Sequence, residues 1–383
     1  MESIIFPAPL NRGDKIAICA FSSCVEKPYH VRLDAVIHGL KLRGYQVVEG
    51  ECLRHLKSAK ERADELTRFL QDDSIAAVMP PWGGELAMEI LQYINFDAIK
   101  SYRPKWIVGF SDVSTFMCIL TARCGWATLH TANLMQQHPD ETDPHCLQVF
   151  DVLALNKGEQ FEQLPAEYYQ DKTINYATEP NALFNLTQPS QWRCLNYKDV
   201  RDIELTGRLF GGCLDSLNVL LATRYLDLHS FKQSYAQEGL VLYLENAELS
   251  PTAVARSLME VKLNGVFADI NGIVLGRSAL VKSPYQDIDY YDAIELALGK
   301  CIFPVIIDAD IGVQNDRVAG LNHHRATCRR QTAADALERL GAGRLTVKTR
   351  GVPFDVDDVR RGFRPSGDRE IVLVVHHADG GPT

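Results

Sequence analysis

The sequence predicts an α/β protein with two parts: an N-terminal open, mostly parallel Rossmann-like sheet, and a C-terminal mixed α/β domain that is barrel-like. Short apolar runs alternate with stretches that carry apolar residues at helical spacing, as a parallel sheet requires. The 383 residues, 46% of them hydrophobic, are enough for two cores. Between Leu155 and Tyr197 the periodicity weakens and polar, turn-forming residues dominate, which indicates a boundary.

The first half repeats a strand–helix unit. Its first apolar run ends in Ser22-Ser23, where an open α/β sheet binds ligands. Each later strand is followed by a helical pattern, so the order is that of parallel crossovers. The predicted strands are 14–21, 45–48, 75–79, 106–110 and 124–129, and the predicted helices are 29–43, 60–70, 86–94 and 113–120.

The second half alternates in the same way after the boundary. We expect Gly211-Gly212 to interrupt the chain between a strand and a helix. The predicted strands are 202–209, 240–244, 272–275 and 304–307, and the predicted helices are 214–221, 251–262 and 290–298. The domains are therefore placed at 1–155 and 200–383, with 156–199 as linker and an atypical ending from residue 313.

Composition excludes several classes of protein. The net charge of −9 argues against a nucleic-acid partner, since a phosphate backbone is bound by clustered basic residues. No window has the roughly 18 apolar residues of a membrane span, so we expect no membrane and a cytoplasmic location. The ten cysteines include no C-x-x-C pair and are read as free thiols, so neither a metal nor a cofactor is expected.

The stretch Lys105–Leu120, KWIVGFSDVSTFMCIL, reads as a buried strand, a tight corner and a helix. This is the geometry of a nucleophile elbow, which projects Ser111 from the carboxyl edge of a sheet. The amide of Asp112, at the start of the helix, could then stabilise an oxyanion. The alternative is that Ser111 caps the helix, and G-F-S-D lacks the second glycine of G-x-S-x-G.

Three other positions could contribute to a site. The glycines of PPWGGE let the backbone approach a ligand, or form a simple tight turn. Glu245 directly follows a buried strand and is either a solvated loop residue or a functional carboxylate. His130 follows another strand, where a hydrogen-bonded structural role is the usual one.

Several motifs, taken in order, resemble the serine LD-carboxypeptidase family, which includes muramoyltetrapeptide carboxypeptidases and microcin C immunity proteins. The likeness runs from Gly13 to about Gly312. The segments that carry it are GDKIAICAFSS, PPWGGE, PKWIVGFSDVSTF, LHTANLM, GRLFGGCLDSL, LYLENAELSP, GIVLGR and PVIIDADIG.

The resemblance implies a cofactor-free Ser-Glu-His hydrolase. Ser111 would be the nucleophile, and Glu245 would orient the histidine that accepts its proton. The amides of Gly84 and Asp112 would form the oxyanion hole. The substrate would be a small peptide, cut at an amide between an L-centre and a D-centre in a cell-wall-type peptide or a peptidyl-nucleotide. Homodimerisation is expected only by analogy with the family.

The ending departs from the family pattern. The family's histidine follows D-x-D-I-G, but here Gly312 is followed by Val313. Arginine and lysine are balanced 14 to 14 up to Gly312 and stand at 11 to 1 afterwards. Residues 313–383 are therefore expected to be foreign to the fold, for example through a change of reading frame.

Two outcomes follow from this departure. Either His323 or His324 reaches the cleft and serves as the base, or the chain is a catalytically impaired, ligand-binding relic. The second is favoured, because a base must lie within roughly 2.6–3.2 Å of the serine oxygen. The tail histidines His376 and His377 are expected to face solvent.

Overall fold

The computed structural model describes residues 3–137, 144–159, 161, 166–197, 203, 205–283, 287–311, 320–321, 342–350, 369–378 and 381–382. Side chains are described for these residues except 144–148 and those after 311. The chain divides into two compact units: one comprises 1–198 and 205–327, and the other comprises 199–204 and 328–383. The first unit contains both predicted sheets, and the exact domain boundaries stay a prediction.

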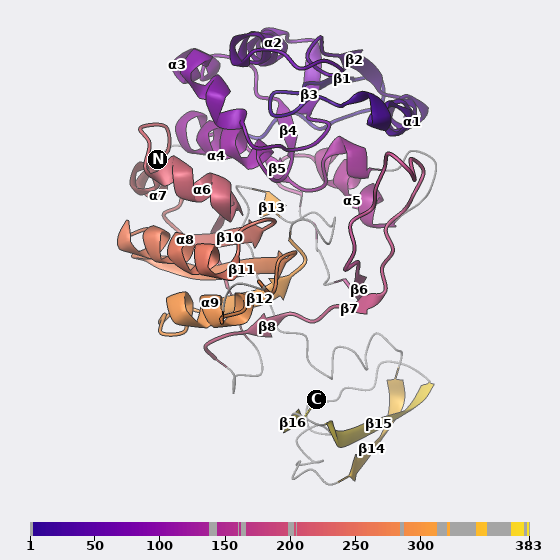
Figure 1. The fold of residues 1–383 in the computed structure, drawn as a ribbon, viewed down its shortest axis with the longest axis vertical. Helices are drawn as coiled ribbons and strands as arrows, with labels where there is room; N and C mark the ends of the chain where they lie inside the picture. The colour runs from indigo at the N-terminus through magenta and orange to yellow at the C-terminus, as the bar shows by residue number, and fades with distance from the viewer. Residues whose placement is uncertain are drawn as a thin grey trace. The chain divides into compact units, whose positions relative to one another are not determined.

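The N-terminal sheet has six strands in the order β13-β5-β4-β3-β1-β2 (Figure 1). All neighbours pair in parallel except β13, which runs antiparallel to β5. The predicted open, mostly parallel sheet is thus confirmed. Its strands are β1 (Lys15–Ile18), β2 (Gln46–Glu49), β3 (Ile75–Met79), β4 (Trp106–Gly109), β5 (Leu129–His130) and β13 (Gly320–Leu321).

The helices of this part begin and end where local chemistry requires. Ser58 and Glu61 form a capping box at the start of α2. Gly125, at φ 67°, ends α4 in the left-handed conformation that glycine adopts without a Cβ clash. The helices are η1 (Lys27–Tyr29), α1 (His30–Leu42), α2 (Ala59–Gln71), η2 (Ala87–Tyr93), α3 (Phe96–Ile99), α4 (Val113–Cys124), η3 (Leu134–Gln136) and α5 (Pro144–Leu153).

Two predictions for the first half were wrong in detail. The helix expected at 86–94 is a 3-10 helix. The strand expected at 124–129 shrinks to two residues, because Cys124 still belongs to α4 and Gly125 caps it.

The second sheet is mixed, as predicted, with the order β8-β12-β11-β10-β9. Only β8 is antiparallel to its neighbour. The helices α6, α8 and α9 lie alongside one another against this sheet (Figure 1). Its elements are β8 (Arg193–Cys194), β9 (Arg208–Cys213), α6 (Leu214–Leu221), α7 (Leu228–Tyr235), β10 (Leu240–Asn246), α8 (Pro251–Leu263), β11 (Ile270–Ser278), α9 (Tyr290–Leu298) and β12 (Val305–Ala309).

The glycine pair of β9 corrects another expectation. Gly211 and Gly212 were read as a break after a strand at 202–209, but both lie inside β9. A Cβ at Gly211 would stand 1.7 Å from the carbonyl oxygen of Tyr243, and one at Gly212 would stand 2.7 Å from the Cβ of Ser114. The glycines therefore let β9 pass close to β10 and α4, rather than turn the chain.

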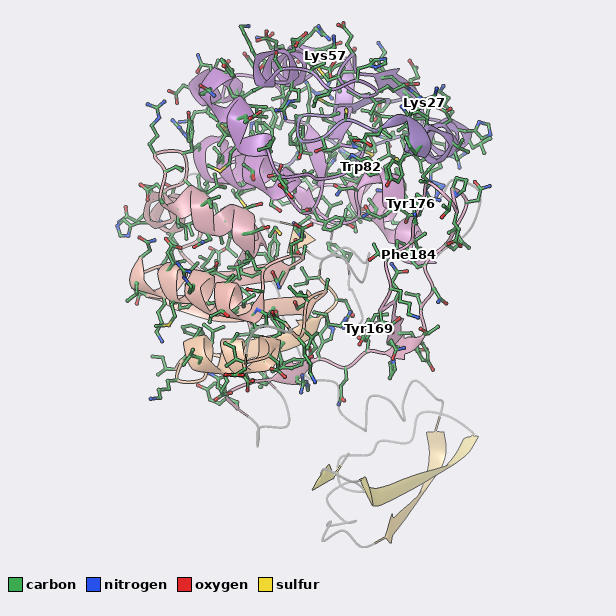
Figure 2. The ribbon with its side chains drawn as sticks, in the orientation of Figure 1. Lys27, Lys57, Trp82, Tyr169, Tyr176 and Phe184 are labelled. Carbon is green, nitrogen blue, oxygen red and sulfur yellow. The ribbon has the colours of Figure 1, made fainter. Side chains whose placement is uncertain are left out.

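A strap formed by residues 166–197, which carries Tyr169, Tyr176 and Phe184 (Figure 2), is held at its middle and near its ends by two buried charged side chains. Arg32 of α1 donates to the carbonyl oxygens of Pro180 and Ala182 at 3.1 and 3.3 Å, and its guanidinium lies over the Tyr176 ring. The fully buried Asp310 accepts from Ser190, from Trp192 and from Arg277. This strap, which includes β6 (Tyr168–Tyr169), β7 (Gln188–Pro189) and β8, lies in the range expected to be linker.

The second unit contains a separate three-stranded sheet in the order β14-β15-β16. β14 and β15 are parallel, and β16 is antiparallel to β15. His376 and His377 lie in β15, and their expected exposure falls outside the described side chains. The strands are β14 (Ala342–Arg350), β15 (Arg369–Ala378) and β16 (Gly381–Pro382).

Candidate active site

Ser111 occupies a sharp corner between β4 and α4. Its φ of 64° is one of three positive values at non-glycine residues in the described chain. A serine rarely adopts this conformation, which costs of order 1–3 kcal/mol and is found most often at functional sites. The corner is held by Asn133, whose side chain accepts from the amide of Phe110 at 3.1 Å and donates to the Phe110 carbonyl at 3.3 Å.

The Ser111 hydroxyl does not cap α4. The residue at the cap is Asp112, and the Ser111 hydroxyl makes no hydrogen bond with any residue in the described part of the chain. Instead it faces Gly83, where a Cβ would stand 2.8 Å from the serine oxygen and 3.2 Å from the amide nitrogen of Asp112. The turn of PPWGGE therefore lies directly over the serine, which only glycine at position 83 permits.

Gly84 has a φ of 151°, and it packs against Ser22 and Ser23, which follow β1. A Cβ at Gly84 would stand 2.2 Å from the Ser23 oxygen and 2.6 Å from the Ser22 oxygen. The predicted donors, the amides of Gly84 and Asp112, thus belong to segments that meet at Ser111. Backbone amides fixed in this way can stabilise negative charge on a reacting oxygen.

Glu245 lies within β10, not after it, and is 1% exposed. Burial raises the pKa of its carboxyl to about 7, while the neighbouring Cys213 thiol and the Ser111 backbone amide act in the opposite direction. The structure therefore brings Glu245 beside Ser111, although the two come from different sheets. Neither carboxyl oxygen has a hydrogen-bond partner among the described residues.

His323 and His324, the two candidates for the base, lie outside the described residues, as do Gly312 and Val313. His130 is a buried histidine close to the elbow, because it pairs with Gly109 where β5 runs beside β4. Neither of its ring nitrogens has a partner among the residues described, and its ring lies 5.2 Å from that of Tyr243. Burial lowers the pKa of His130 to about 3, so it is neutral at pH 7 but a weak base.

Sequence reasoning missed two links between the elbow and the second sheet. The Ser114 hydroxyl accepts from the amide of Cys213 at 3.2 Å, and the Cys118 thiol donates to the carbonyl of Gly211 at 3.3 Å. Both side chains project from α4 toward β9. The small residues at helical spacing after Ser111 were the only sequence signal for this packing.

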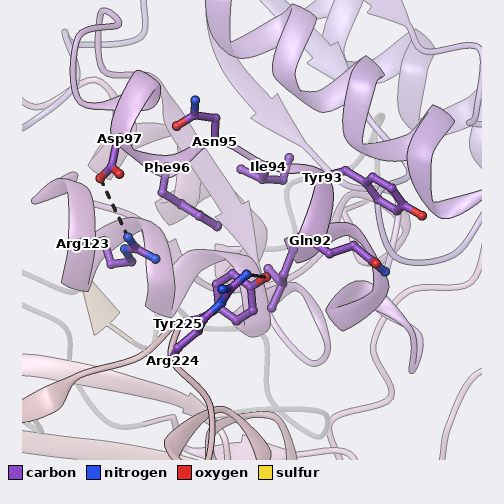
Figure 3. Close-up of a pocket in the computed structure, with 10 residues that line it drawn as sticks. Gln92, Tyr93, Ile94, Asn95, Phe96, Asp97, Arg123, Arg224 and Tyr225 are labelled. Carbon is purple, nitrogen blue, oxygen red and sulfur yellow. Dashed lines mark hydrogen bonds and ion pairs between the residues drawn. The ribbon is translucent and has the colours of Figure 1, made fainter.

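A pocket of about 440 Å³ lies at the other end of α4 and contains none of the predicted site residues (Figure 3). Arg123 is 3.8 Å from Asp97 there, and the rings of Phe96 and Tyr225 pack at 6.3 Å. No group of three or more potential metal ligands occurs in the part of the chain that the structure describes. None of the helices described there is both long and apolar enough to cross a membrane.

Comparisons with known proteins show the family of the chain. The family model for the LD-carboxypeptidase N-terminal domain matches residues 16–131, and that for the C-terminal domain matches 206–327. The Escherichia coli microcin C7 self-immunity protein MccF is 23% identical over 284 residues, which is 72% of this chain and 79% of MccF. A Bacillus subtilis protein named as a murein peptide carboxypeptidase is 26% identical and covers 70% of this chain and 73% of its own length.

Solved structures share the fold. An MccF-like protein from Bacillus anthracis aligns with a TM-score of 0.71 at 19% identity, over 84% of this chain and 95% of its own. MccF in complex with aspartyl sulfamoyl adenosine aligns with a TM-score of 0.67 at 21% identity, over 84% and 93%.

The ending matches a different family. The model described as THUMP domain-like covers residues 325–383 in the frame as translated, which argues against a change of reading frame. The expectation that the chain is foreign to the fold from residue 313 was wrong for residues 313–327, because the carboxypeptidase C-terminal model continues to residue 327 and Gly320–Leu321 pairs with β5. The two carboxypeptidase models, in contrast, match ranges that contain every candidate site residue and all strands of the two large sheets except β8 and the first residue of β1. Over residues 16–327, the chain therefore belongs to the LD-carboxypeptidase family.

Proposed function

We propose that the chain is a serine carboxypeptidase that cuts an amide between an L-centre and a D-centre in a small peptide or a peptidyl-nucleotide. The observation that carries the proposal is the convergence at Ser111: its strained backbone, the Gly83 turn against its oxygen and the buried Glu245 beside its amide. The relatives support the substrate class, since one is named for murein peptides and MccF was solved with aspartyl sulfamoyl adenosine.

In this mechanism the Ser111 oxygen attacks the amide carbonyl, and a histidine takes its proton. The amides of Gly84 and Asp112 stabilise the oxyanion, the amine leaves with a proton, and water then releases the acyl group. Glu245 holds the histidine in the correct orientation. His323 or His324 is the proposed source of that histidine, because the family's position is taken by Val313.

The second candidate is a ligand-binding protein with at most residual hydrolysis. It is favoured by Val313, which takes the position of the family's histidine, so that Glu245 has no base to orient there. In this case the cleft and the oxyanion hole persist, and binding outlasts catalysis.

A serine-directed fluorophosphonate separates the two candidates. An active hydrolase is labelled at Ser111, as mass spectrometry of the tryptic peptide would show, and Glu245→Gln slows the labelling. A binding protein remains unlabelled but still binds a product-like peptide by calorimetry. Ser111→Ala is the control for both, since it removes the reacting oxygen and leaves the backbone corner in place. If the protein is not labelled and does not bind the peptide, both candidates are rejected.

A further inference from the structure

The side chain of Asp112 connects three separate segments at the candidate site. Its Oδ2 accepts from the Ser22 hydroxyl at 2.6 Å and from the amide of Ala87 at 2.7 Å. Its Oδ1 accepts from the Thr115 hydroxyl at 3.1 Å. The side chain is 7% exposed, so these bonds are shielded from competing water.

Each of the three donors belongs to a segment that borders Ser111. Ser22 follows β1 and packs against Gly84, and Ala87 opens η2 directly after the PPWGGE turn. Thr115 lies in the first turn of α4, which begins at the corner. The carboxylate therefore fixes the Gly83-Gly84 turn relative to the start of α4.

The Ser22 segment is itself held from its other side. Arg62, which is 4% exposed, donates to the carbonyl oxygens of Phe21 and Ser22 at 2.7 and 2.8 Å. The same guanidinium pairs with Glu89 of η2 at 2.7 Å. Ser22 and η2 are thus joined to each other by Arg62, and the bonds of Asp112 join them to α4.

We propose that Asp112 is a positioning residue that builds the oxyanion hole through its side chain, in addition to offering its own amide. This inference rests on the proposed function of Ser111. An oxyanion donor must lie 2.7–3.1 Å from the charged oxygen, so a small shift of the Gly84 amide relative to that of Asp112 weakens catalysis. The carboxylate of Asp112 sets that separation.

The test compares Asp112→Ala with Asp112→Asn in labelling of Ser111 by a fluorophosphonate. The alanine variant loses all three acceptor bonds, and its maximal labelling rate should fall by about 10–100-fold, part of the loss seen when an oxyanion donor is deleted. The asparagine oxygen can still accept from Ser22 and Ala87, so this variant should keep its rate within about five-fold. The half-saturating probe concentration should change less than about two-fold in both.

Two controls separate positioning from loss of stability. Ser58→Ala removes the cap of α2, far along the chain from the corner, and should lower the melting temperature but not the labelling rate. Ser22→Ala should slow labelling and add little to Asp112→Ala, because both changes remove the hydrogen bond between Ser22 and Asp112.

The outcomes are distinct. An unchanged labelling rate in Asp112→Ala, or a rate that falls only in proportion to stability as in Ser58→Ala, overturns the inference and leaves the proposed function intact. Wild-type protein that is not labelled at Ser111 at all overturns the proposed function and the inference with it.

Discussion

Glu245 and Cys213 stand directly opposite each other on the parallel strands β10 and β9, and both side chains are almost completely buried. The thiol is a weak donor and does not form a hydrogen bond of normal geometry with the carboxyl group. An ionised Glu245 is therefore poorly compensated, and its pKa rises to about 7. Burial likewise raises the pKa of the Cys213 thiol well above its usual range, and the nearby carboxylate adds to this.

The first prediction concerns stability against pH. The carboxyl of Glu245 titrates near 4.5 when exposed and near 7 in the fold, so the folded protein loses stability as pH rises from about 4.5 to 7. The Glu245→Gln variant lacks this loss. Its free energy of unfolding relative to wild type should therefore rise by about 2–4 kcal/mol between pH 4.5 and 8, at about 1.4 kcal/mol per pKa unit.

Urea unfolding at both pH values measures the Glu245 effect, and the exposed Glu248→Gln is the matched control, for which the difference should stay flat. A Glu245→Gln difference that does not change with pH would mean that Glu245 stays charged in the fold, with a partner beyond the described residues.

The second prediction uses the strained corner. Ser111→Gly and Ser111→Ala both remove the hydroxyl, but only glycine relieves the left-handed conformation. Glycine also raises the conformational entropy of the unfolded chain, which offsets part of the relieved strain. Ser111→Gly should therefore be more stable than Ser111→Ala by about 1 kcal/mol. At Ser230, on the exposed surface of α7, the same pair of changes should give the opposite order, because alanine favours a helix. Chemical denaturation of the four variants is the measurement, and alanine preferred at both positions would contradict the strain.

The third prediction concerns Gly83. A Cβ there meets both the Cβ and the oxygen of Ser111 at 2.8 Å, so Gly83→Ala should displace the serine or the turn. Labelling of Ser111 should fall by about 100-fold, and stability should fall by about 1–3 kcal/mol, as for other overpacked sites. Gly13→Ala is the control, since its φ of 95° strains the backbone but its Cβ meets nothing within 4 Å. If both variants retain full labelling, the turn does not lie against the nucleophile.

The fourth prediction concerns the missing base. A serine hydrolase that lacks one triad member keeps roughly 10³–10⁴-fold catalysis over water from its oxyanion hole and binding alone. Under the second candidate, wild-type protein should therefore bind a product-like peptide and hydrolyse the substrate slowly. Val313→His, joined to the family's ending, should raise kcat by orders of magnitude, whereas Val313→Gln should not. High activity in the wild type that His323→Ala or His324→Ala abolishes would show instead that the present ending supplies the base.

Periodicity in the sequence predicted the order of the elements well, because an amphipathic helix must repeat its apolar residues every three to four positions whatever its surroundings. The bounds predicted for α6 and α9 agree with the structure. The glycines of β9 were misread because a glycine in a turn and a glycine under a crossing backbone look alike in one sequence. Only the tertiary structure distinguishes them, since a Cβ added at Gly211 would stand 1.7 Å from the Tyr243 carbonyl oxygen.

The candidate site divides in the same way. Ser111 could be named from its strand–turn–helix pattern, and Glu245 from its place after an apolar run together with the family motifs. The bonds of Asn133 and Asp112 could not, since they join segments whose contact depends on the tertiary fold. The shift from lysine to arginine after Gly312 did indicate a change in the chain, but composition cannot name the family to which the new segment is similar.

The place where the two family matches meet has a consequence for how such a chain can arise. The carboxypeptidase match ends at residue 327 and the THUMP domain-like match begins at 325, after β12 and β13, the last strands of the two large sheets. Asp310, which anchors the strap, also lies before this point. Recombination here therefore exchanges the ending in a single event without removing a strand of either large sheet.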